Sequence, residues 1–349
     1  MTRRSGVFGA MALAACCSVA LPEAVAAERK LPRRSAGCGA RPAAAPGKSV
    51  STTLQVGELA REYRLHVPTG YDPETAVPLL LVFHGYTGTA ETTENGESSF
   101  SRHADTHGYA VVYPQGTGFE VGGSLITSWN DLACNASPGP EGSICTTDAD
   151  DYPTPPECGE PRECDWCSCH DDVGFVAALL DELERTLCVD LDRVYATGIS
   201  NGGMFVHRLG CDLPKRFAAI APVAGTIAKG GGCAPPTSPK ISMINIHGTR
   251  DRVVPFDGTP ADDGFLYTPT AQVIAEWAGT SSQQCDREGS PYKTSRDGVS
   301  DFRCVQRANC VTGAELVDCA WDGGHDWPRN GEDQFSVDVI WEFFEKNGR

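Results

Sequence analysis

The amino-acid sequence predicts an α/β protein in which helices cover both faces of a mainly parallel sheet. The first observation is that short, continuous apolar runs alternate along the chain with amphipathic segments, a pattern typical of buried parallel strands joined by helices. The second is size, because 349 residues, 40% of them hydrophobic, can bury a large core. These observations exclude a small scaffold held together by metal or disulfides alone.

Seven apolar runs are predicted to be strands and five amphipathic segments to be helices. The strands are expected at residues 63–67, 78–83, 110–113, 193–197, 217–223, 241–246 and 315–321. The helices are expected at 99–107, 173–187, 203–209, 270–278 and 336–346. Asp171 and Asp172 precede the second of these helices, where a carboxylate can accept the free N–H groups of the first turn.

A long stretch at about 130–170 interrupts this alternation. It carries six cysteines and many prolines and has almost no apolar periodicity, so we expect a disulfide-rich insertion. Within it, Cys164, Cys167, Cys169 and His170 resemble metal ligands in their spacing. No second ligand pair stands at a matching distance, which favours a stapled loop, and we expect no metal site.

The first 27 residues have the layout of a secretory signal peptide. Arg3 and Arg4 precede an apolar run, and small residues at 24–27 provide a cleavage site. The alternative is lipidation at Cys16, because Leu13-Ala14-Ala15-Cys16 is similar to a bacterial lipobox. The sequence therefore predicts export, to the periplasm or the extracellular space, with lipid anchoring as the alternative.

The remaining composition narrows the class of protein further. Removal of residues 1–27 would leave 14 of 16 cysteines, an even number typical of disulfides in an oxidising compartment. Residues 28–49 are expected to be a poorly ordered segment pinned only through Cys38, followed by the folded domain at 50–349. The net charge of −17 argues against binding to nucleic acid, and no further segment has the ~20 apolar residues of a membrane span.

Gly198-Ile199-Ser200-Asn201-Gly202 fits the pattern of a nucleophile elbow. The short pattern is weak alone, but it follows a predicted strand and precedes a predicted helix, which is the setting that an elbow requires. A serine hydroxyl needs a neighbouring imidazole to accept its proton and a carboxylate to orient that imidazole. The sequence therefore predicts Ser200 as a nucleophile, followed along the chain by an acid and then a histidine.

Two later strands are followed by residues that can serve as the acid and the histidine. Asp251 follows the strand predicted at 241–246, with Asp257 as the alternative acid, and His325 follows the strand predicted at 315–321. Most of the other histidines lie in predicted strands, helices or loops that give them structural roles. We therefore expect Asp251 to orient His325, and His325 to act as the base for Ser200.

Hydrolysis by a serine, an acid and a histidine also needs hydrogen-bond donors that stabilise the negative oxygen of the intermediate. The backbone N–H groups of Tyr86, in the loop after the strand at 78–83, and of Asn201 are the expected oxyanion hole. His84 is expected to brace this loop. Trp129 and Trp327 are candidates for an aromatic wall against the substrate, although a role in the core explains each of them equally well.

Several stretches taken together resemble a known family. They are VFHGYTGTA (82–90), SWND (128–131), HDDVGFVAALLDEL (170–183), CVDLDRVYATGISNGGMFVHRLGCD (188–212), FAAIAPVAG (217–225), INIHGTRDRVVPF (244–256) and GGHDWP (323–328). They are similar to the carbohydrate-esterase group of feruloyl esterases and polyhydroxybutyrate-depolymerase-like (LpqC-like) esterases. This resemblance implies an α/β-hydrolase fold and the same three residues, Ser200, Asp251 and His325.

The sequence thus predicts an exported serine ester hydrolase that needs no cofactor. The resemblance, with Cys38 and the segment around Cys188, favours a feruloyl-esterase-like enzyme acting on esters of plant cell-wall polysaccharide. The main alternative is a depolymerase of aliphatic polyesters such as polyhydroxybutyrate. A binding protein on an inactive hydrolase scaffold is the alternative outside enzymes, and the sequence leaves the oligomeric state open.

Overall fold

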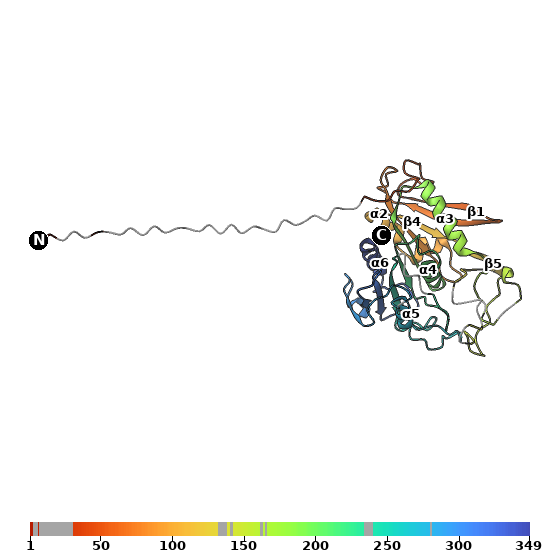
Figure 1. Ribbon diagram of the computed structural model, residues 1–349. Coiled ribbons are helices and arrows are strands. Elements are labelled where there is room, and N and C mark those ends of the chain that lie inside the picture. The colour runs from red at the N-terminus through yellow and green to blue at the C-terminus, as the bar shows by residue number, and fades with distance from the viewer. Residues whose placement is uncertain are drawn as a thin grey trace. The chain divides into compact units, whose positions relative to one another are not determined.

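The computed structural model describes residues 1, 2, 6, 31–131, 138, 139, 142–160, 163, 164, 166–233, 240–279 and 281–349, and a ten-stranded sheet is its main feature (Figure 1). The strands of this sheet are β1 (Lys48–Val56), β2 (Leu59–Val67), β3 (Val77–Phe83), β4 (Ala110–Pro114), β7 (Val189–Ile199), β8 (Ala219–Val223), β9 (Ser242–Gly248), β10 (Gly289–Tyr292), β11 (Arg303–Arg307) and β12 (Leu316–Trp321). Two more strands, β5 (Thr117–Val121) and β6 (Ser124–Ser128), form a separate hairpin.

The strand order is β1-β2-β4-β3-β7-β8-β9-β12-β11-β10. The six strands in the middle, from β4 to β12, run parallel to one another. The strands β1 and β2 at one edge, and β11 and β10 at the other, pair antiparallel. The prediction of a mainly parallel sheet is therefore confirmed, and each of the seven expected strands overlaps an observed one.

The helices are α1 (Ala90–Thr92), α2 (Phe100–His107), α3 (Asp172–Thr186), α4 (Asn201–Asp212), α5 (Thr270–Trp277) and α6 (Ser336–Lys346). Short turns of other helical types lie at Thr93–Glu97, Pro156–Cys158 and Val299–Asp301. The five expected helices correspond to α2 through α6. None of the helices in the described part of the chain is long and apolar enough to span a membrane.

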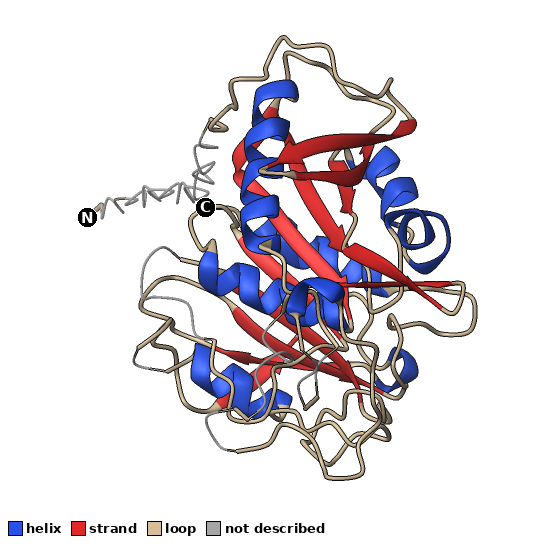
Figure 2. Ribbon diagram, turned by 90° about the vertical axis from the view of Figure 1, so that its right-hand side faces the viewer, coloured by secondary structure: helices blue, strands red, loops and turns tan. Residues whose placement is uncertain are grey.

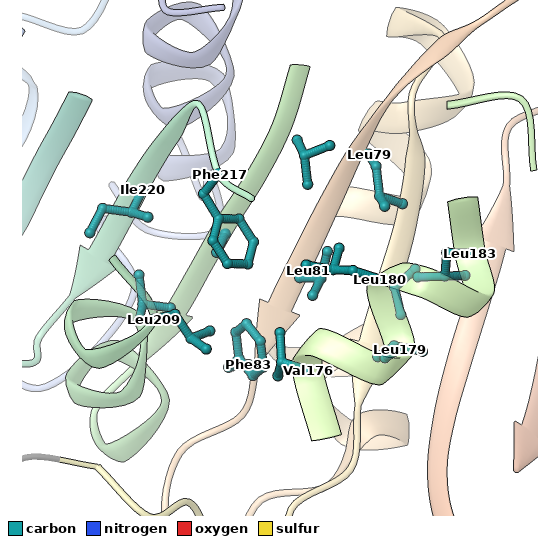
Figure 3. Packing of buried hydrophobic residues seen from close by; sticks show 14 of the residues in the cluster. Leu79, Leu81, Phe83, Val176, Leu179, Leu180, Leu183, Leu209, Phe217 and Ile220 are labelled. Carbon is teal, nitrogen blue, oxygen red and sulfur yellow. The ribbon is translucent and has the colours of Figure 1, made fainter. Parts of the chain in front are cut away.

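Helices cover both faces of the sheet, as Figure 2 shows. Strand β3 is buried along its whole length, and its side chains alternate between two cores. Leu79, Leu81 and Phe83 face α3, α4 and α5, and Figure 3 shows the leucines of α3 packed against them. Leu80 and Val82 face α2 and α6. Burial on both faces is why β3 reads as a continuous apolar run.

The predicted cap of α3 is found in part. Asp171 accepts a hydrogen bond from the N–H of Gly174 at 2.8 Å and caps the helix as predicted. Asp172 instead turns into the protein and binds Arg61 at 2.7 Å in an ion pair that is almost fully buried. A buried charge needs such a partner, because desolvation would otherwise destabilise the fold.

The segment before β1 is attached more firmly than the sequence suggested. Cys38 forms a disulfide with Cys188, and the N–H groups of Ser35 and Gly37 bind the carbonyl oxygens of Val189 and Glu184. The expectation of an arm pinned only through Cys38 is thus corrected over residues 32–47, because backbone pairing anchors it as well. The predicted signal peptide and Cys16 lie outside the described residues, except for residues 1, 2 and 6.

Six disulfides join pairs of described cysteines, which agrees with an extracellular protein. They are Cys38–Cys188, Cys145–Cys164, Cys158–Cys169, Cys211–Cys233, Cys285–Cys310 and Cys304–Cys319. Two of them lie within the insertion at 130–170. The cluster of Cys145, Glu163 and Cys164 has metal-like spacing, but the bond between its two sulfur atoms removes them as thiolate ligands.

Candidate active site

Ser200 lies in a sharp turn between β7 and α4. Its φ and ψ angles are 58° and −128°, a backbone conformation that L-residues rarely adopt. The turn depends on Gly202, because an added Cβ there would lie 2.4 Å from the carbonyl oxygen of His84 and 2.5 Å from that of Phe83. A Cβ added at Gly198 would likewise lie only 2.8 Å from backbone atoms of Gly202. Close packing of strand and helix therefore fixes the geometry that the sequence predicted for an elbow.

The loop after β3 lies directly beside Ser200. A Cβ placed on Gly85 would be 3.3 Å from the Cβ of Ser200 and 3.8 Å from its Oγ. His84 braces this loop, since its Nδ1 donates to the carbonyl oxygen of Gly85 at 2.7 Å and its Nε2 accepts from the N–H of Gly116 at 2.9 Å. Burial lowers the pKa of His84 to about 4, so the ring stays neutral, as its bracing role requires.

The side chain of Asn201 has a role that the sequence analysis missed. Its Oδ1 accepts the N–H of Trp129 at 2.8 Å, and its Nδ2 donates to the carbonyl oxygen of Trp129 and to Asp131. The side chain thus ties the start of α4 to the segment after β6 and holds the backbone of Asn201 in place. The motif SWND and an asparagine after the serine were the available signal.

Neither candidate tryptophan has a surface for a substrate. Trp129 is 0% exposed and stacks on Phe205 with ring centroids 5.2 Å apart. Its indole N–H donates to the backbone carbonyl oxygen of His84. Trp327 is 1% exposed and packs edge-on against Phe100. The proposed aromatic wall is corrected for both residues, and the alternative of a core role describes them, because a buried ring cannot contact a bound ligand.

Asp251 and His325 contact each other at the ends of two neighbouring parallel strands, β9 and β12. The Nδ1 of His325 lies 2.8 Å from Oδ2 of Asp251. The Oδ1 of Asp251 accepts the N–H groups of Val253 and Val254, both at 2.9 Å. The alternative acid, Asp257, instead accepts hydrogen bonds from Thr259.

The electrostatics of this pair suit an acid that remains charged. Burial by itself would raise the pKa of Asp251, but hydrogen bonds from His247 and His325 and the attraction of both rings outweigh it. The pKa of Asp251 therefore lies well below its ordinary value. The side chain of His325 is 20% exposed, so one face of the ring remains accessible to a reactant.

The topology brings the predicted residues to one edge of the sheet. Gly85, Ser200, Asp251 and His325 follow β3, β7, β9 and β12, which are parallel strands, and the carboxyl ends of parallel strands meet at the same edge. Only β8 separates the two pairs of strands, and Ser200 donates its N–H to Val223 at the end of β8. Binding sites of open α/β sheets lie at this edge.

Aromatic rings of the insertion extend the site beyond the predicted residues. Tyr86 makes edge-on contacts with Tyr152 at 5.4 Å and Trp166 at 5.3 Å, and both partners belong to the insertion. Tyr86 and Tyr152 are partly exposed residues, although the hydroxyl of Tyr86 is buried. The predicted aromatic wall consisted of two tryptophans, whereas these three rings lie in, or against, the loop beside Ser200.

Comparison with known proteins identifies relatives of the whole chain. No family model matches the chain. It is 31% identical to the esterase NocK of Nocardia uniformis subsp. tsuyamanensis, over 94% of this chain and 90% of that protein. It is also 27% identical to feruloyl esterase C of Emericella nidulans, over 89% of this chain and 90% of that protein.

Solved structures agree on the fold. An acetyl xylan esterase from Aspergillus awamori has a TM-score of 0.52 and 16% identity, and the match covers 84% of this chain and 99% of that one. A protein named sOPH has a TM-score of 0.53 and 16% identity, covering 88% and 90%. The resemblance found in the sequence is confirmed: the chain belongs to the esterase family that contains NocK and the feruloyl esterases, and it is a carboxylic ester hydrolase with the α/β-hydrolase fold.

Proposed function

We propose that this esterase works through Ser200, His325 and Asp251 and forms an acyl-enzyme. The hydroxyl of Ser200 attacks the ester carbonyl while His325 accepts its proton and then passes it to the leaving alcohol. Water, activated by the same ring, then releases the acid. The observation that carries the proposal is the 2.8 Å contact between His325 and Asp251, at the same edge of the sheet as a serine in a strained turn.

The backbone N–H groups of Asn201 and Tyr86 are the proposed oxyanion hole. Asn201 begins α4, where the first N–H groups of a helix have no partner within the helix and attract negative charge. Gly85, which precedes Tyr86, lies against Ser200, which supports a donor from this loop close to the reacting carbonyl. Donors that are already oriented stabilise a developing negative charge without reorganisation.

The proposed substrates are hydroxycinnamoyl esters of plant cell-wall polysaccharide. Relatives named feruloyl esterase support the acyl group, and the rings of the partly exposed residues Tyr86 and Tyr152 supply flat apolar surface near the loop beside Ser200. Planar aromatic groups bind well to such rings. We also propose export by a signal peptide over residues 1–27, with lipidation at Cys16 as the alternative.

The variant Ser200→Ala tests the catalytic assignment. We expect its rate of ester hydrolysis to fall by at least about 10³-fold, because no nucleophile remains, while circular dichroism and thermal unfolding stay unchanged. A serine-directed phosphonate should label the wild-type protein at Ser200, as peptide mapping by mass spectrometry would show. Near-wild-type hydrolysis by the variant, or a wild-type protein that takes up no label, would refute the assignment and favour a binding protein.

A substrate panel tests the acyl group. We expect kcat/KM for methyl ferulate to exceed that for short 3-hydroxybutyrate oligomers by about tenfold or more, since only ferulate presents a ring to Tyr86 and Tyr152. Acetate esters of the same alcohol serve as the reference. Faster cleavage of the hydroxybutyrate oligomers would favour the polyester alternative, and equal slow rates on both would leave a general esterase.

A further inference from the structure

A second histidine touches the proposed catalytic acid. His247 lies on β9, and its side chain is 1% exposed. Its Nε2 is 3.3 Å from Oδ2 of Asp251 and 2.7 Å from the carbonyl oxygen of Val254. Both neighbours are acceptors, so the ring carries its proton on Nε2 and donates toward both of them. The proposed proton transfers do not use this ring.

The other nitrogen of His247 faces a different environment. Among the described residues, Nδ1 of His247 has no hydrogen-bond partner, and the ring borders a cavity of about 310 Å³. Asp318 of the neighbouring strand lines the same cavity, and burial raises the pKa of its carboxyl. Among the described titratable groups, Asp251, Asp318 and His207 interact electrostatically with His247. The ring of His247 therefore has acceptors near Nε2, where Asp251 lies, and no hydrogen-bond partner among the described residues at Nδ1.

The anchoring of His247 differs from that of the other donors to Asp251. The N–H groups of Val253 and Val254 belong to the same loop as Asp251 and would move with it. His325 also lies on a loop, after β12. His247 is part of a central strand whose two neighbours, β8 and β12, hold its backbone. Of these donors, His247 therefore ties the carboxylate to the sheet itself.

We propose that His247 is a positioning residue for ester hydrolysis. Its Nε2–H holds Oδ2 of Asp251 and the carbonyl of Val254 together, so that the same carboxylate oxygen points at Nδ1 of His325. The proposal rests on the catalytic role of Asp251 and His325 given above. Without this link the carboxylate can shift with its loop, and misplacement of a catalytic group by about 1 Å can cost on the order of 100-fold in rate.

A role in packing alone predicts different behaviour from the same residue. If His247 only fills space in the core, a leucine of similar volume should serve as well as a glutamine. If the Nε2–H matters, glutamine should be better, because its amide nitrogen can reach the place of Nε2, whereas the amide of asparagine ends near the place of Nδ1.

The test compares His247→Gln, His247→Leu and His247→Asn in the full disulfide-bonded chain. For His247→Leu we expect kcat on methyl ferulate to fall by about tenfold or more with KM nearly unchanged, and phosphonate labelling of Ser200 to slow in parallel. His247→Gln should recover most of both rates and His247→Asn should not. If His247→Leu does not fold, the pair of glutamine and asparagine variants carries the same comparison.

A matched control is His207→Leu, because His207 is also buried and, among the described residues, its ring nitrogens make no hydrogen bond to Asp251 or His325. We expect its kcat to stay within about twofold of the wild type. Equal rates for the leucine, asparagine and glutamine variants at position 247 would overturn the inference. That outcome differs from failure of the proposed function, in which the wild-type protein itself would not be labelled at Ser200.

Discussion

The two sides of the active site are built in different ways. On the side of the nucleophile, β3, β7 and α4 pack so closely that Gly198 and Gly202 have backbone atoms within 3 Å of any added Cβ. On the side of the acid and base, Asp251 and His325 lie in loops and are held by side-chain hydrogen bonds. A further loop, the insertion, packs against this region through a buried apolar cluster that includes Trp166, Val254 and Phe265.

The difference indicates how the protein divides its tasks. The nucleophile and the oxyanion donors need a fixed geometry, and backbone packing gives them little freedom to move. The acid and base need only a hydrogen bond between them and an exposed face of the ring, which loops can supply. Loops also tolerate insertions, so the selectivity for substrates can change there without disturbing the nucleophile.

The largest effect expected from this comparison comes from the addition of one methyl group. Gly202→Ala places a Cβ 2.4 Å from the carbonyl oxygen of His84, so strand or helix must shift. We expect kcat/KM to fall by on the order of 100-fold, since Ser200 and the N–H of Asn201 move with the helix. Steady-state kinetics on methyl ferulate, with thermal unfolding alongside, would measure this.

Gly324→Ala is the control on the other side. A Cβ at Gly324 would have its nearest neighbour, the carbonyl oxygen of Arg250, at 4.0 Å, which is an ordinary contact. We expect kcat/KM to stay within about threefold of the wild type even though His325 is the next residue. Equal losses in the two variants would show that the comparison between a packed side and a tolerant side is wrong.

An intermediate effect is expected at the insertion. Tyr152→Leu removes the ring that contacts Tyr86 and keeps apolar volume. Because an aromatic pair contributes about 0.5–1.5 kcal/mol, we expect kcat/KM for methyl ferulate to fall about three- to tenfold, with little change for an acetate ester. Tyr152→Phe keeps the ring but loses the hydrogen bond to Asp263. It therefore separates the contribution of the ring from that of the hydroxyl group. An equal loss of kcat/KM for both esters would indicate that the substitution destabilises the protein rather than weakening its contact with the ferulate ring.

The same division explains what the sequence could and could not predict. The elbow around Ser200, the loop after β3 and the buried parallel strands have local signals, namely glycine spacing and continuous apolar runs. The antiparallel edge strands β1, β10 and β11 were missed, because they are largely exposed and lack such runs. Their partners are close in sequence, since β1 pairs with β2 and β10 with β11, but an exposed strand buries too little apolar surface to leave a clear pattern.

Long-range contacts also limited the prediction of the site. The order of Ser200, Asp251 and His325 follows from where strands end, so even the contact between Asp251 and His325, which are 74 positions apart, was expected. The aromatic contacts of Tyr86 with the insertion depend on how a long loop folds back, and no periodic pattern encodes that path. The pairing of the cysteines could not be predicted from the sequence for the same reason.

The smallest expected effect concerns stability below neutral pH. Burial, with help from neighbouring His107, lowers the pKa of His103 to about 4, and burial lowers that of His84 to the same value. The ordinary value is 6.5, so between 6.5 and about 4 the unfolded chain binds protons that the folded chain does not. The free energy of unfolding should therefore fall as the pH drops through this window. Asp251 does not interfere, because its contribution is lost only as the pH falls below its unfolded value of 3.8.

His103→Asn isolates one of these groups without touching the active site. His103 lies on α2 and its Nδ1 binds the hydroxyl of Tyr109 at 2.9 Å, a contact that the amide of asparagine can replace. Because one titrating group is gone, the slope of unfolding free energy against pH should decrease by up to about 1.4 kcal/mol per pH unit within the window. Urea unfolding at several pH values would measure it, and kcat/KM at neutral pH should not change. Parallel slopes for variant and wild type would mean that His103 binds protons alike in the folded and unfolded protein, so that folding does not lower its pKa.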